Sequence, residues 1–244
     1  MLSAKRILIT GASRGIGRAA ALACAAAGAR VGMNYHRSEG PARQLCEELG
    51  ASSRALRFDV SDAAAIARGV DEFVEFAGGI DGLVNNAGIN LPSLLVTATD
   101  ADVASMVSTN LVGPILATRA VLPVMLRQRS GVIVNVSSVA AARPFRGQAV
   151  YAATKGGLES FTRAVAVEYG RKGIRCHAVR PGAVDTDMLA ATKAMAGDDL
   201  LARIPLGRLA GADEIARLIV FLLSDQAAYA TGSIYAFDGG FDAG

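Results

Sequence analysis

Cysteine, histidine and net charge are all scarce in this sequence. Its 244 residues include three cysteines and two histidines, and the formal net charge is +3 at pH 7. Cys24, Cys46 and Cys176 are odd in number and lack metal-site spacing, so we predict no metal and reduced thiols, as in a cytoplasmic protein. The charge is small and forms no basic cluster with aromatic residues, so nucleic-acid binding is not predicted.

Signals for targeting, for linkers and for internal repeats are also missing. The first apolar run begins within about six residues of the N-terminus, which leaves no room for a signal peptide. We find no apolar run of membrane length and predict no membrane partner. Hydrophobic residues make up 52% of the chain and charged residues 19%. This composition predicts a single globular domain over residues 1–244 with an ample core.

Short apolar runs alternate with helical patterns along the chain. Seven runs are bounded by Gly, Asp or Asn, which is typical of parallel strands buried on both faces: Ile7–Ile9, Arg30–Tyr35, Ala55–Phe58, Gly82–Val84, Val132–Val136, Ile174–Val179 and Ile234–Phe237. Helical patterns lie between them, at Arg18–Ala27, Pro41–Leu49, Asp62–Phe76, Asp100–Arg129, Gln148–Tyr169 and Ala212–Leu223. This order predicts an α/β fold, a doubly wound (Rossmann) parallel sheet of seven strands with helices on both faces. The segment at about 188–205 breaks the alternation and is interpreted as a short substrate lid; the alternative is a packed pair of surface helices.

The sequence TGASRGIG, residues 10–17, joins the first strand to the first helix. Gly11 permits the tight turn, Gly15 lets the backbone approach a pyrophosphate, and Gly17 lets the helix pack closely on the strand. The first N–H groups of the helix have no partners within the helix, so they point at the phosphate. The spacing is G-x-x-x-G-x-G, and by itself it also fits an ordinary glycine-rich turn.

The end of the second strand indicates which nicotinamide dinucleotide is bound. NAD-binding folds place an acid about 20 residues after the glycines, where it bonds the ribose. Here Tyr35, His36 and Arg37 occupy that place. No acid repels a 2′-phosphate, and Arg14 and Arg37 can hold one. The sequence therefore favours NADP (NADPH) as cofactor; the alternative is that Arg37 is a solvated loop residue.

Four side chains form a candidate catalytic group. Tyr151 and Lys155 lie one helical turn apart, on one helix face. A free tyrosine has a pKa of about 10, and a neighbouring ammonium lowers it by favouring the phenolate. Ser138 follows the fifth strand at the same sheet edge, where its hydroxyl can polarise a carbonyl. Asn110 is a poor helix former inside a long helix, which it can bend while binding a water. Each residue also has a purely structural interpretation. Tyr151 can be a half-buried helix residue with Lys155 as an unrelated surface lysine, Ser138 can cap the strand end, and Asn110 can face solvent.

Together these motifs resemble those of the short-chain dehydrogenases/reductases, from Ile7 to Gly240. The matching residues are TGASRGIG at 10–17, NNAG at 85–88, Asn110, Ser138, YAATK at 151–155 and PGAVDT at 181–186. The resemblance implies that Tyr151 exchanges the proton and that Lys155 binds the nicotinamide ribose and lowers the pKa of the tyrosine. It also implies that Ser138 holds the substrate oxygen and Asn110 supports a water relay. The cofactor residues that the motifs and the resemblance suggest are Gly11, Ser13, Arg14, Gly15, Ile16, Gly17, Tyr35, His36, Arg37, Asp59, Val60, Asn86, Ala87, Gly88, Tyr151, Lys155, Pro181, Gly182, Val184 and Thr186.

Within that family the chain is similar to the 3-oxoacyl-acyl-carrier-protein reductases of fatty acid biosynthesis. The likeness lies in GASRGIG at 11–17, RIPLGRL at 203–209 and ATGSIYAFDGG at 230–240. It implies NADPH-dependent reduction of a 3-oxoacyl thioester on acyl carrier protein or coenzyme A, a homotetramer, and carrier docking near the cleft by Arg129 and Lys172. The sequence departs from the pattern at 90–93, at His177 and at Arg180, which leaves the carrier-bound substrate open.

Two other readings remain. The first is an NAD(P)-dependent dehydrogenase of another secondary alcohol, polyol or sugar. The second is a non-catalytic NADP-binding sensor on the same fold. An intact set of Ser138, Tyr151 and Lys155 argues against the sensor, which does not need these residues.

Overall fold

A parallel sheet of seven strands forms the centre of the computed structural model, which describes residues 1–189 and 199–243. The strand order is β3-β2-β1-β4-β5-β6-β7. The strands are β1 (Arg6–Ile9), β2 (Arg30–Tyr35), β3 (Ser53–Arg57), β4 (Gly82–Asn85), β5 (Gly131–Val136), β6 (Ile174–Pro181) and β7 (Ile234–Phe237). Since the order reverses direction between β1 and β4, this junction is where a doubly wound sheet binds its ligand.

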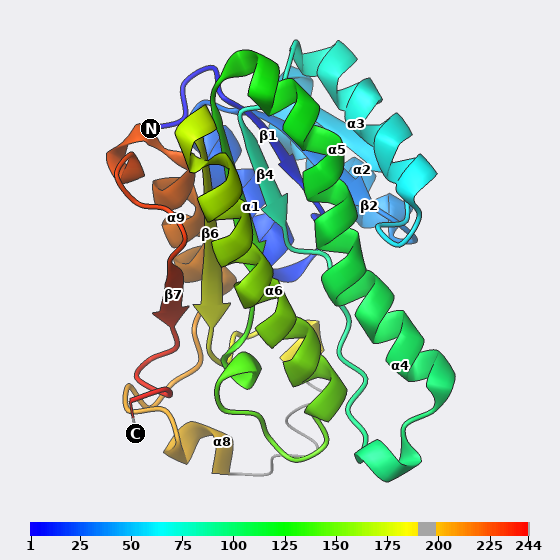
Figure 1. Ribbon diagram of the computed structural model, residues 1–244, viewed down its shortest axis with the longest axis vertical. Coiled ribbons are helices and arrows are strands. Elements are labelled where there is room, and N and C mark those ends of the chain that lie inside the picture. The colour runs from blue at the N-terminus through cyan, green and yellow to red at the C-terminus, as the bar shows by residue number, and fades with distance from the viewer. Residues whose placement is uncertain (190–198, 244) are drawn as a thin grey trace.

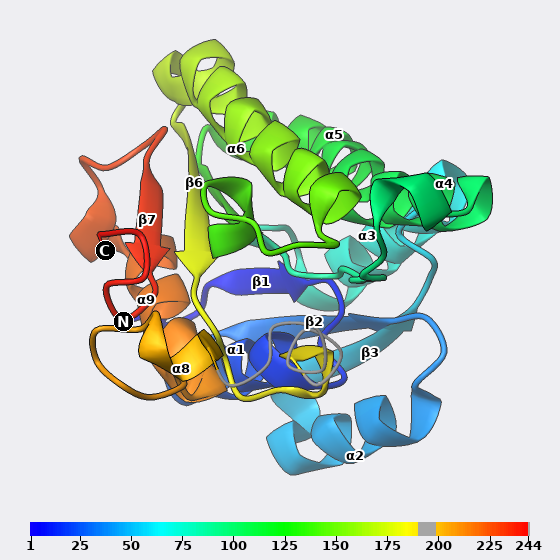
Figure 2. The same ribbon diagram turned by 90° about the horizontal axis from the view of Figure 1, so that it is seen from below.

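Helices cover both faces of the sheet (Figure 2). One face carries α1 (Gly15–Ala26), α2 (Glu39–Leu49) and α9 (Ala212–Leu223). The other carries α3 (Ala63–Ala77), α4 (Asp100–Val107), α5 (Gly113–Gln128) and α6 (Ala149–Tyr169), and a short helix, α8 (Asp199–Ala202), lies beyond the strand ends. Each face has its own apolar core, and central strand residues such as Ile7 and Leu8 point to opposite cores. The predicted doubly wound fold is confirmed.

The predicted strands and helices agree with the structure to within a few residues at their ends. The strands β2 and β7 and the helix α9 have the predicted bounds. Asp62 caps α3, since its carboxylate accepts hydrogen bonds from the N–H groups of Ala64 and Ala65. This bond satisfies donors that have no partner within the helix.

The helix predicted over Asp100–Arg129 is one rod of three parts. A π-helical turn, Ser108–Val112, joins α4 to α5 and contains the buried Asn110. Such turns occur frequently at functional sites. By length and composition the rod Asp100–Gln128 could cross a membrane, contrary to the prediction that no segment reaches that length. Its inner residues, Ala117, Val121 and Met125 among them, pack into the core with α3, so its composition is that of a core helix.

All seven strands run in the same direction, so the sheet has a carboxyl end and an amino end. Figure 1 shows the arrowheads of the strands pointing to the end where α4, α8 and the first turns of α6 lie. The loops that leave β1, β4, β5 and β6 therefore meet at this carboxyl end, whereas the loops that enter the strands gather at the amino end.

Candidate active site

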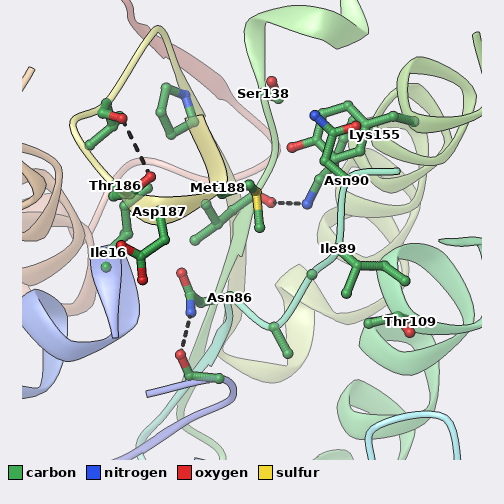
Figure 3. A pocket seen from close by; sticks show the side chains of 18 of the residues that line it. Ile16, Asn86, Ile89, Asn90, Thr109, Ser138, Lys155, Thr186, Asp187 and Met188 are labelled. Carbon is green, nitrogen blue, oxygen red and sulfur yellow. Dashed lines mark hydrogen bonds between the residues drawn. The ribbon is translucent and has the colours of Figure 1, made fainter. Parts of the chain in front are cut away.

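A pocket of about 840 Å³ extends along the carboxyl ends of the strands (Figure 3). Figure 3 shows Ile16 and Asn86 on one side and Ser138 and Lys155 on the other. The predicted site residues that line it are Gly11, Ser13, Arg14, Gly15, Ile16, His36, Arg37, Asp59, Val60, Asn86, Ala87, Gly88, Ser138, Tyr151, Lys155, Pro181, Gly182, Val184 and Thr186. The fold thus brings together residues from seven separate segments of the chain.

The glycine loop is shaped for close approach of a ligand. Gly11 and Gly15 have φ values of +65° and +53°, a left-handed conformation that side chains rarely adopt. A Cβ on Gly11 would lie 2.8 Å from the Cα of Ala87, and one on Gly15 would lie 3.3 Å from the Cγ2 of Thr186. The loop therefore keeps an open cradle at the start of α1, where free helix N–H groups favour a phosphate.

Buried amides hold this cradle in place. The Nδ2 group of Asn86 donates to the carbonyls of Thr10 and Gly11, at 3.0 and 2.9 Å. The Oδ1 atom of Asn34 accepts from the Gly11 N–H at 3.1 Å, and its Nδ2 donates to the Phe58 carbonyl at 2.8 Å. Asn34 was missed by the sequence reasoning, because inside an apolar run it gives no signal other than its polarity.

Among the described residues, three predicted site residues do not line the pocket. Gly17 faces the Gly11 carbonyl and the Asn86 amide, so its role is close packing of α1 on the loop. Tyr35 is buried on β2, and the neighbouring Asn34 lines the pocket in its place. Strand alternation explains this, since successive side chains point to opposite faces. Asn110 lies behind the wall.

Charged side chains surround the pocket beyond the end of β2. His36 Nδ1 lies 3.7 Å from Asp59 Oδ2, and Arg14 lies 3.7 Å from Asp187 in an exposed pair. Burial raises the pKa of Asp59, but hydrogen bonds from Ser61 and the charges of His36 and Arg37 outweigh burial and lower it. Arg14 and Arg37 both line the pocket, where their guanidinium groups can meet an anion.

Ser138, Tyr151 and Lys155 meet on the opposite wall. Ser138 follows β5, and Tyr151 lies in the first turn of α6; both residues line the pocket. Lys155, one turn further on, donates from Nζ to the Val136 carbonyl at 2.8 Å. Its Nζ lies 5.7 Å from the centre of the Tyr151 ring. Tyr151 and Lys155 are 8% and 4% exposed, so both meet the pocket through a narrow opening.

The expected lowering of the Tyr151 pKa involves Lys155 together with a bound cofactor. In the protein alone, burial raises the pKa of Tyr151, and the neighbouring Ser138 hydroxyl offsets this only in part. Burial also lowers the pKa of Lys155 to about 8. The Lys155 ammonium donates to the Val136 carbonyl. A lower pKa for Tyr151 therefore requires a further charge beside Tyr151 and Lys155.

Asn110 lies in the π-helical turn and bonds the loop that follows β4. Its Oδ1 accepts from the Ile89 N–H, and its Nδ2 donates to the Ile89 carbonyl, both at 2.8 Å. A longer bond of 3.4 Å reaches Thr154 on α6. Asn110 is fully buried and therefore fixes the loop after β4 against the helix that carries Tyr151. The π-helical turn is consistent with the predicted bend, but the amide faces this loop and not solvent.

Known proteins match this chain over nearly its whole length. The family model described as enoyl-(acyl carrier protein) reductase matches residues 11–242. The 3-oxoacyl-acyl-carrier-protein reductase FabG of Escherichia coli is 41% identical over 97% of this chain and 96% of its own. The chain belongs to the short-chain dehydrogenase/reductase family. It is an oxidoreductase of the kind that uses a nicotinamide cofactor.

Two solved structures of the same family show the fold. The 3-ketoacyl-(acyl-carrier-protein) reductase from Brucella melitensis, complexed with NADH, has a TM-score of 0.94 and 34% identity over 99% of this chain and 100% of its own. Levodione reductase has a TM-score of 0.92 and 37% identity, over 100% of this chain and 99% of its own. Ketone substrates appear in both names, although the two molecules differ.

The half of the pocket beyond Ser138 is mainly apolar, and the sequence reasoning missed most of it. Its apolar lining residues are Ile89, Leu91, Val139, Ala140, Phe145, Met188, Leu189, Leu200 and Phe241. They come from loops without a shared motif, so only the tertiary structure unites them. Of the predicted lid at about 188–205, residues 190–198 lie outside the described residues, and the described part contributes Met188, Leu189 and Leu200.

Arg129 and Lys172 do not lie near the cleft, contrary to the expectation from the resemblance. Arg129 ends α5 just before β5, and Lys172 lies just before β6. Both are exposed at the amino end of the strands. The pocket is at the other end, because loops that enter parallel strands and loops that leave them lie on opposite edges of the sheet.

Proposed function

We propose that this oxidoreductase reduces a ketone to a secondary alcohol, with a 3-oxoacyl thioester as substrate and NADPH as cofactor. The observation that carries the proposal is that Ser138, Tyr151 and the buried Lys155 line one pocket together, with Lys155 Nζ 5.7 Å from the centre of the Tyr151 ring. In the proposed reaction the nicotinamide supplies a hydride to the carbonyl carbon. Tyr151 gives its hydroxyl proton to the carbonyl oxygen, which Ser138 holds and polarises.

The other site residues have supporting roles in this proposal. Lys155 binds the nicotinamide ribose and, when that site is filled, favours the ionised tyrosine. Asn110 holds the loop after β4 against α6. It also supports the water relay through which Tyr151 recovers its proton. The chain forms a single catalytic domain in this proposal, and the described part of the predicted lid contributes Met188, Leu189 and Leu200 to the apolar half of the pocket.

Preference for NADPH is proposed from the charges beyond β2. The 2′-phosphate would meet the Arg14 and Arg37 side chains, both at the pocket wall. Bidentate contacts between guanidinium and phosphate are strong and geometrically specific. The pyrophosphate would lie on the backbone of the Gly11 and Gly15 cradle, where both positions need glycine because of their positive φ and the close approach of Ala87 and Thr186.

The apolar half of the pocket and the relatives' names support a 3-oxoacyl thioester. An acyl chain would be covered by Ile89, Val139 and Phe145, among others. The alternative is an NAD(P)-dependent dehydrogenase of another secondary alcohol, polyol or sugar. The likeness to levodione reductase supports a ketone other than a 3-oxoacyl thioester as a second candidate substrate. We place the enzyme in the cytoplasm, consistent with its three free cysteines.

A homotetramer is part of the proposal. Only 44% of the apolar window in the rod Asp100–Gln128 is buried, and Val112, Leu126 and Val167 are exposed on α5, α6 and the turn beside them. Pairing of these helices between copies would cover them. Light scattering tests the assembly: a monomer at micromolar concentration would contradict it.

A panel of substrates tests the proposed activity. Acetoacetyl thioester, other ketones, secondary alcohols and sugars are each mixed with NADPH, NADH or the oxidised forms, and the nicotinamide absorbance is followed. We expect the fastest NADPH oxidation with acetoacetyl thioester. Crotonyl thioester tests the carbon–carbon double-bond reduction named in the family description, and we expect it to remain unreduced.

A further inference from the structure

A buried ion-pair network lies directly behind the pocket and has no part in the proposed chemistry. Arg180 on β6 binds both carboxylate oxygens of Glu159 on α6, at 2.8 and 2.6 Å. The third guanidinium nitrogen donates to Asp242 Oδ2 at 2.8 Å. Ser137 donates its hydroxyl to Glu159 Oε1 at 2.8 Å. The side chains of Glu159 and Arg180 are 6% and 18% exposed, so these bonds are shielded from water.

Every member of this network is next to a part of the pocket wall. Ser137 precedes Ser138, Arg180 precedes Pro181, and Asp242 follows Phe241. Glu159 lies one turn beyond Lys155 on α6. The network therefore joins β5, β6, α6 and the end of the chain at the places where each reaches the pocket.

The last of these places is a tight turn, Asp238–Asp242, that we term the C-terminal turn. Its Asp238 carboxylate accepts from the N–H groups of Gly240 and Asp242, both at 2.9 Å. Gly239 and Gly240 have φ values of +65° and +90°, so the chain reverses sharply there. This geometry presents Phe241 toward the pocket.

Phe241 forms an apolar wall with residues from two other segments. It is 3% exposed and packs with Val139 and Ile204. Its ring centre lies 5.6 Å from that of Phe145, and the Arg203 guanidinium lies over both rings, at 4.9 Å from Phe145 and 5.5 Å from Phe241. Val139 follows Ser138, so this wall faces whatever is attached to the reacting carbonyl.

We infer that Phe241 is a specificity-determining residue for the substrate and that Arg180 and Asp242 are positioning residues that hold it in place. The inference rests on the proposed carbonyl reduction. Asp242 connects the end of the chain to a guanidinium that Glu159 fixes within the body of the domain. Without the Asp242 carboxylate, the C-terminal turn keeps its main-chain bonds but loses its ionic connection to β6 and α6. The Phe241 side chain is then no longer held in a single position beside the acyl group of the substrate.

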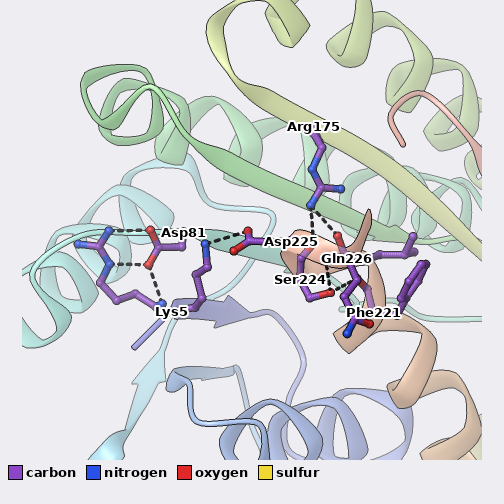
Figure 4. A network of polar contacts seen from close by, with 9 residues as sticks. Lys5, Asp81, Arg175, Phe221, Ser224, Asp225 and Gln226 are labelled. Atoms are coloured by element: carbon purple, nitrogen blue, oxygen red, sulfur yellow. Dashed lines mark hydrogen bonds and ion pairs between the residues drawn. The ribbon is translucent and has the colours of Figure 1, made fainter. Parts of the chain in front are cut away.

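The opposite end of the sheet offers a matched control pair (Figure 4). Arg6 on β1 binds both carboxylate oxygens of Asp81, at 2.7 and 2.6 Å. The two side chains are 24% and 17% exposed, close to the 18% and 21% of Arg180 and Asp242. This pair is similar in chemistry and burial but remote from the pocket, so it measures what an ion pair contributes to stability alone.

The test compares Asp242→Ala with Asp81→Ala in the full-length chain. Arg180 keeps both bonds to Glu159 in Asp242→Ala, so we expect this variant to fold. We expect its KM for acetoacetyl thioester to rise about tenfold, the size of effect typical of small changes in substrate position. The kcat and the Kd for NADPH, measured by nicotinamide fluorescence, should stay within about twofold. Asp81→Ala should lower the Tm and leave KM unchanged.

Two further variants separate positioning from a purely structural role. Asp242→Asn keeps an oxygen that can accept from Arg180, so it should recover part of the KM. Phe241→Ala should raise KM by itself, and adding Asp242→Ala to it should change KM little further, because Asp242 acts through Phe241. Hydrogen exchange should be faster at the amides of the C-terminal turn in Asp242→Ala and unchanged there in Asp81→Ala.

Each outcome decides the inference. An unchanged KM in Asp242→Ala, a loss confined to kcat, or additive effects of Asp242→Ala and Phe241→Ala would overturn it. Failure of the proposed function is seen separately, as a wild-type chain that oxidises no NADPH with any ketone. In that case unchanged hydrogen exchange in the C-terminal turn of Asp242→Ala would still refute the positioning role, and faster exchange would support it.

Discussion

At the amino end of the sheet, Arg6 holds Asp81 with the same two-bonded geometry that Arg180 uses for Glu159 at the carboxyl end. The neighbours of the two pairs differ. Arg6 and Asp81 have neighbours that join strands to helices far from the pocket. An example is Arg175, which donates to the carbonyls of Leu222 and Ser224 (Figure 4). Around Arg180 lie the loops that line the pocket. The comparison predicts that an ion pair at the amino end contributes to stability alone, whereas one at the carboxyl end also positions residues of the pocket.

The largest expected contrast between the two ends concerns two tyrosines of α6. Tyr151 begins this helix at the pocket, and Tyr169 ends it at the amino end. Tyr151→Phe keeps the ring but removes the proposed proton donor, so kcat should fall by about 10²–10⁴-fold while NADPH binding survives. Tyr169→Phe should leave kcat unchanged. Steady-state kinetics with acetoacetyl thioester check both, and near-normal turnover by Tyr151→Phe would return Tyr151 to a structural role.

A smaller contrast is expected between two arginines at opposite ends of β2. Arg37 follows the strand at the pocket, whereas Arg30 begins it at the amino end and is exposed. Loss of one charged hydrogen bond costs about 1.5–3 kcal/mol, so Arg37→Ala should weaken NADPH binding by about tenfold or more. NADH binding should change little, because NADH lacks the 2′-phosphate, and Arg30→Ala should change neither. Calorimetry with both cofactors measures this, and equal losses for NADPH and NADH would contradict the proposed preference.

The pH dependence of NADPH binding provides a third contrast. Burial lowers the pKa of Lys155 to about 8, so its ammonium loses the proton as the pH rises through that value. Affinity should therefore be constant at lower pH and fall severalfold above pH 8, since only the charged form offers a full positive charge. Lys155→Met should bind more weakly without this pH dependence, and Lys5→Met at the amino end should behave as the wild type. A wild-type affinity that stays level through pH 8 would count against the assigned role.

The smallest contrast is in stability. Asp81→Ala removes one partner of a partly buried pair and should cost about 1–3 kcal/mol, which lowers the Tm by roughly 2–4 °C for each kcal/mol. Its kinetic constants should equal those of the wild type. Thermal unfolding followed by circular dichroism provides the measurement; a changed kcat in this variant would show that the two ends are not separable.

The sequence was sufficient to predict the fold and most of one wall of the pocket. Strand and helix periods, the glycines at 11 and 15, and the motifs around Ser138, Tyr151 and Lys155 are local in the chain, and each predicts a local geometry. The side chain of Tyr35 was misplaced because strand alternation turns it away from the pocket, and the two hydrogen bonds from Asn110 to Ile89 could not be predicted because they depend on a π-helical turn. Asn34 and Phe241 were missed because their roles arise only when distant segments pack together.

The direction of the Tyr151 pKa shift shows another limit of sequence reasoning. A lysine one turn away predicts a lower pKa for Tyr151, but in the protein alone burial is the largest effect and raises it. Likewise, Arg129 and Lys172 match a family pattern, yet strand direction places them far from the pocket of their own chain. Both results depend on three-dimensional placement that spacing alone does not contain.

Transfer of deuterium from labelled NADPH tests the central claim most directly. The wild-type chain is incubated with acetoacetyl thioester and NADPH that carries deuterium at the transferable position, and the product is analysed by mass spectrometry. We predict a 3-hydroxybutyryl thioester with one deuterium on the carbon that bears the hydroxyl group, and no such product from Tyr151→Phe on the same timescale. Absence of deuterium from that carbon would contradict carbonyl reduction at the carboxyl end of the sheet. So would deuterium transfer seen only in a parallel incubation with crotonyl thioester, where it would mark a saturated acyl chain.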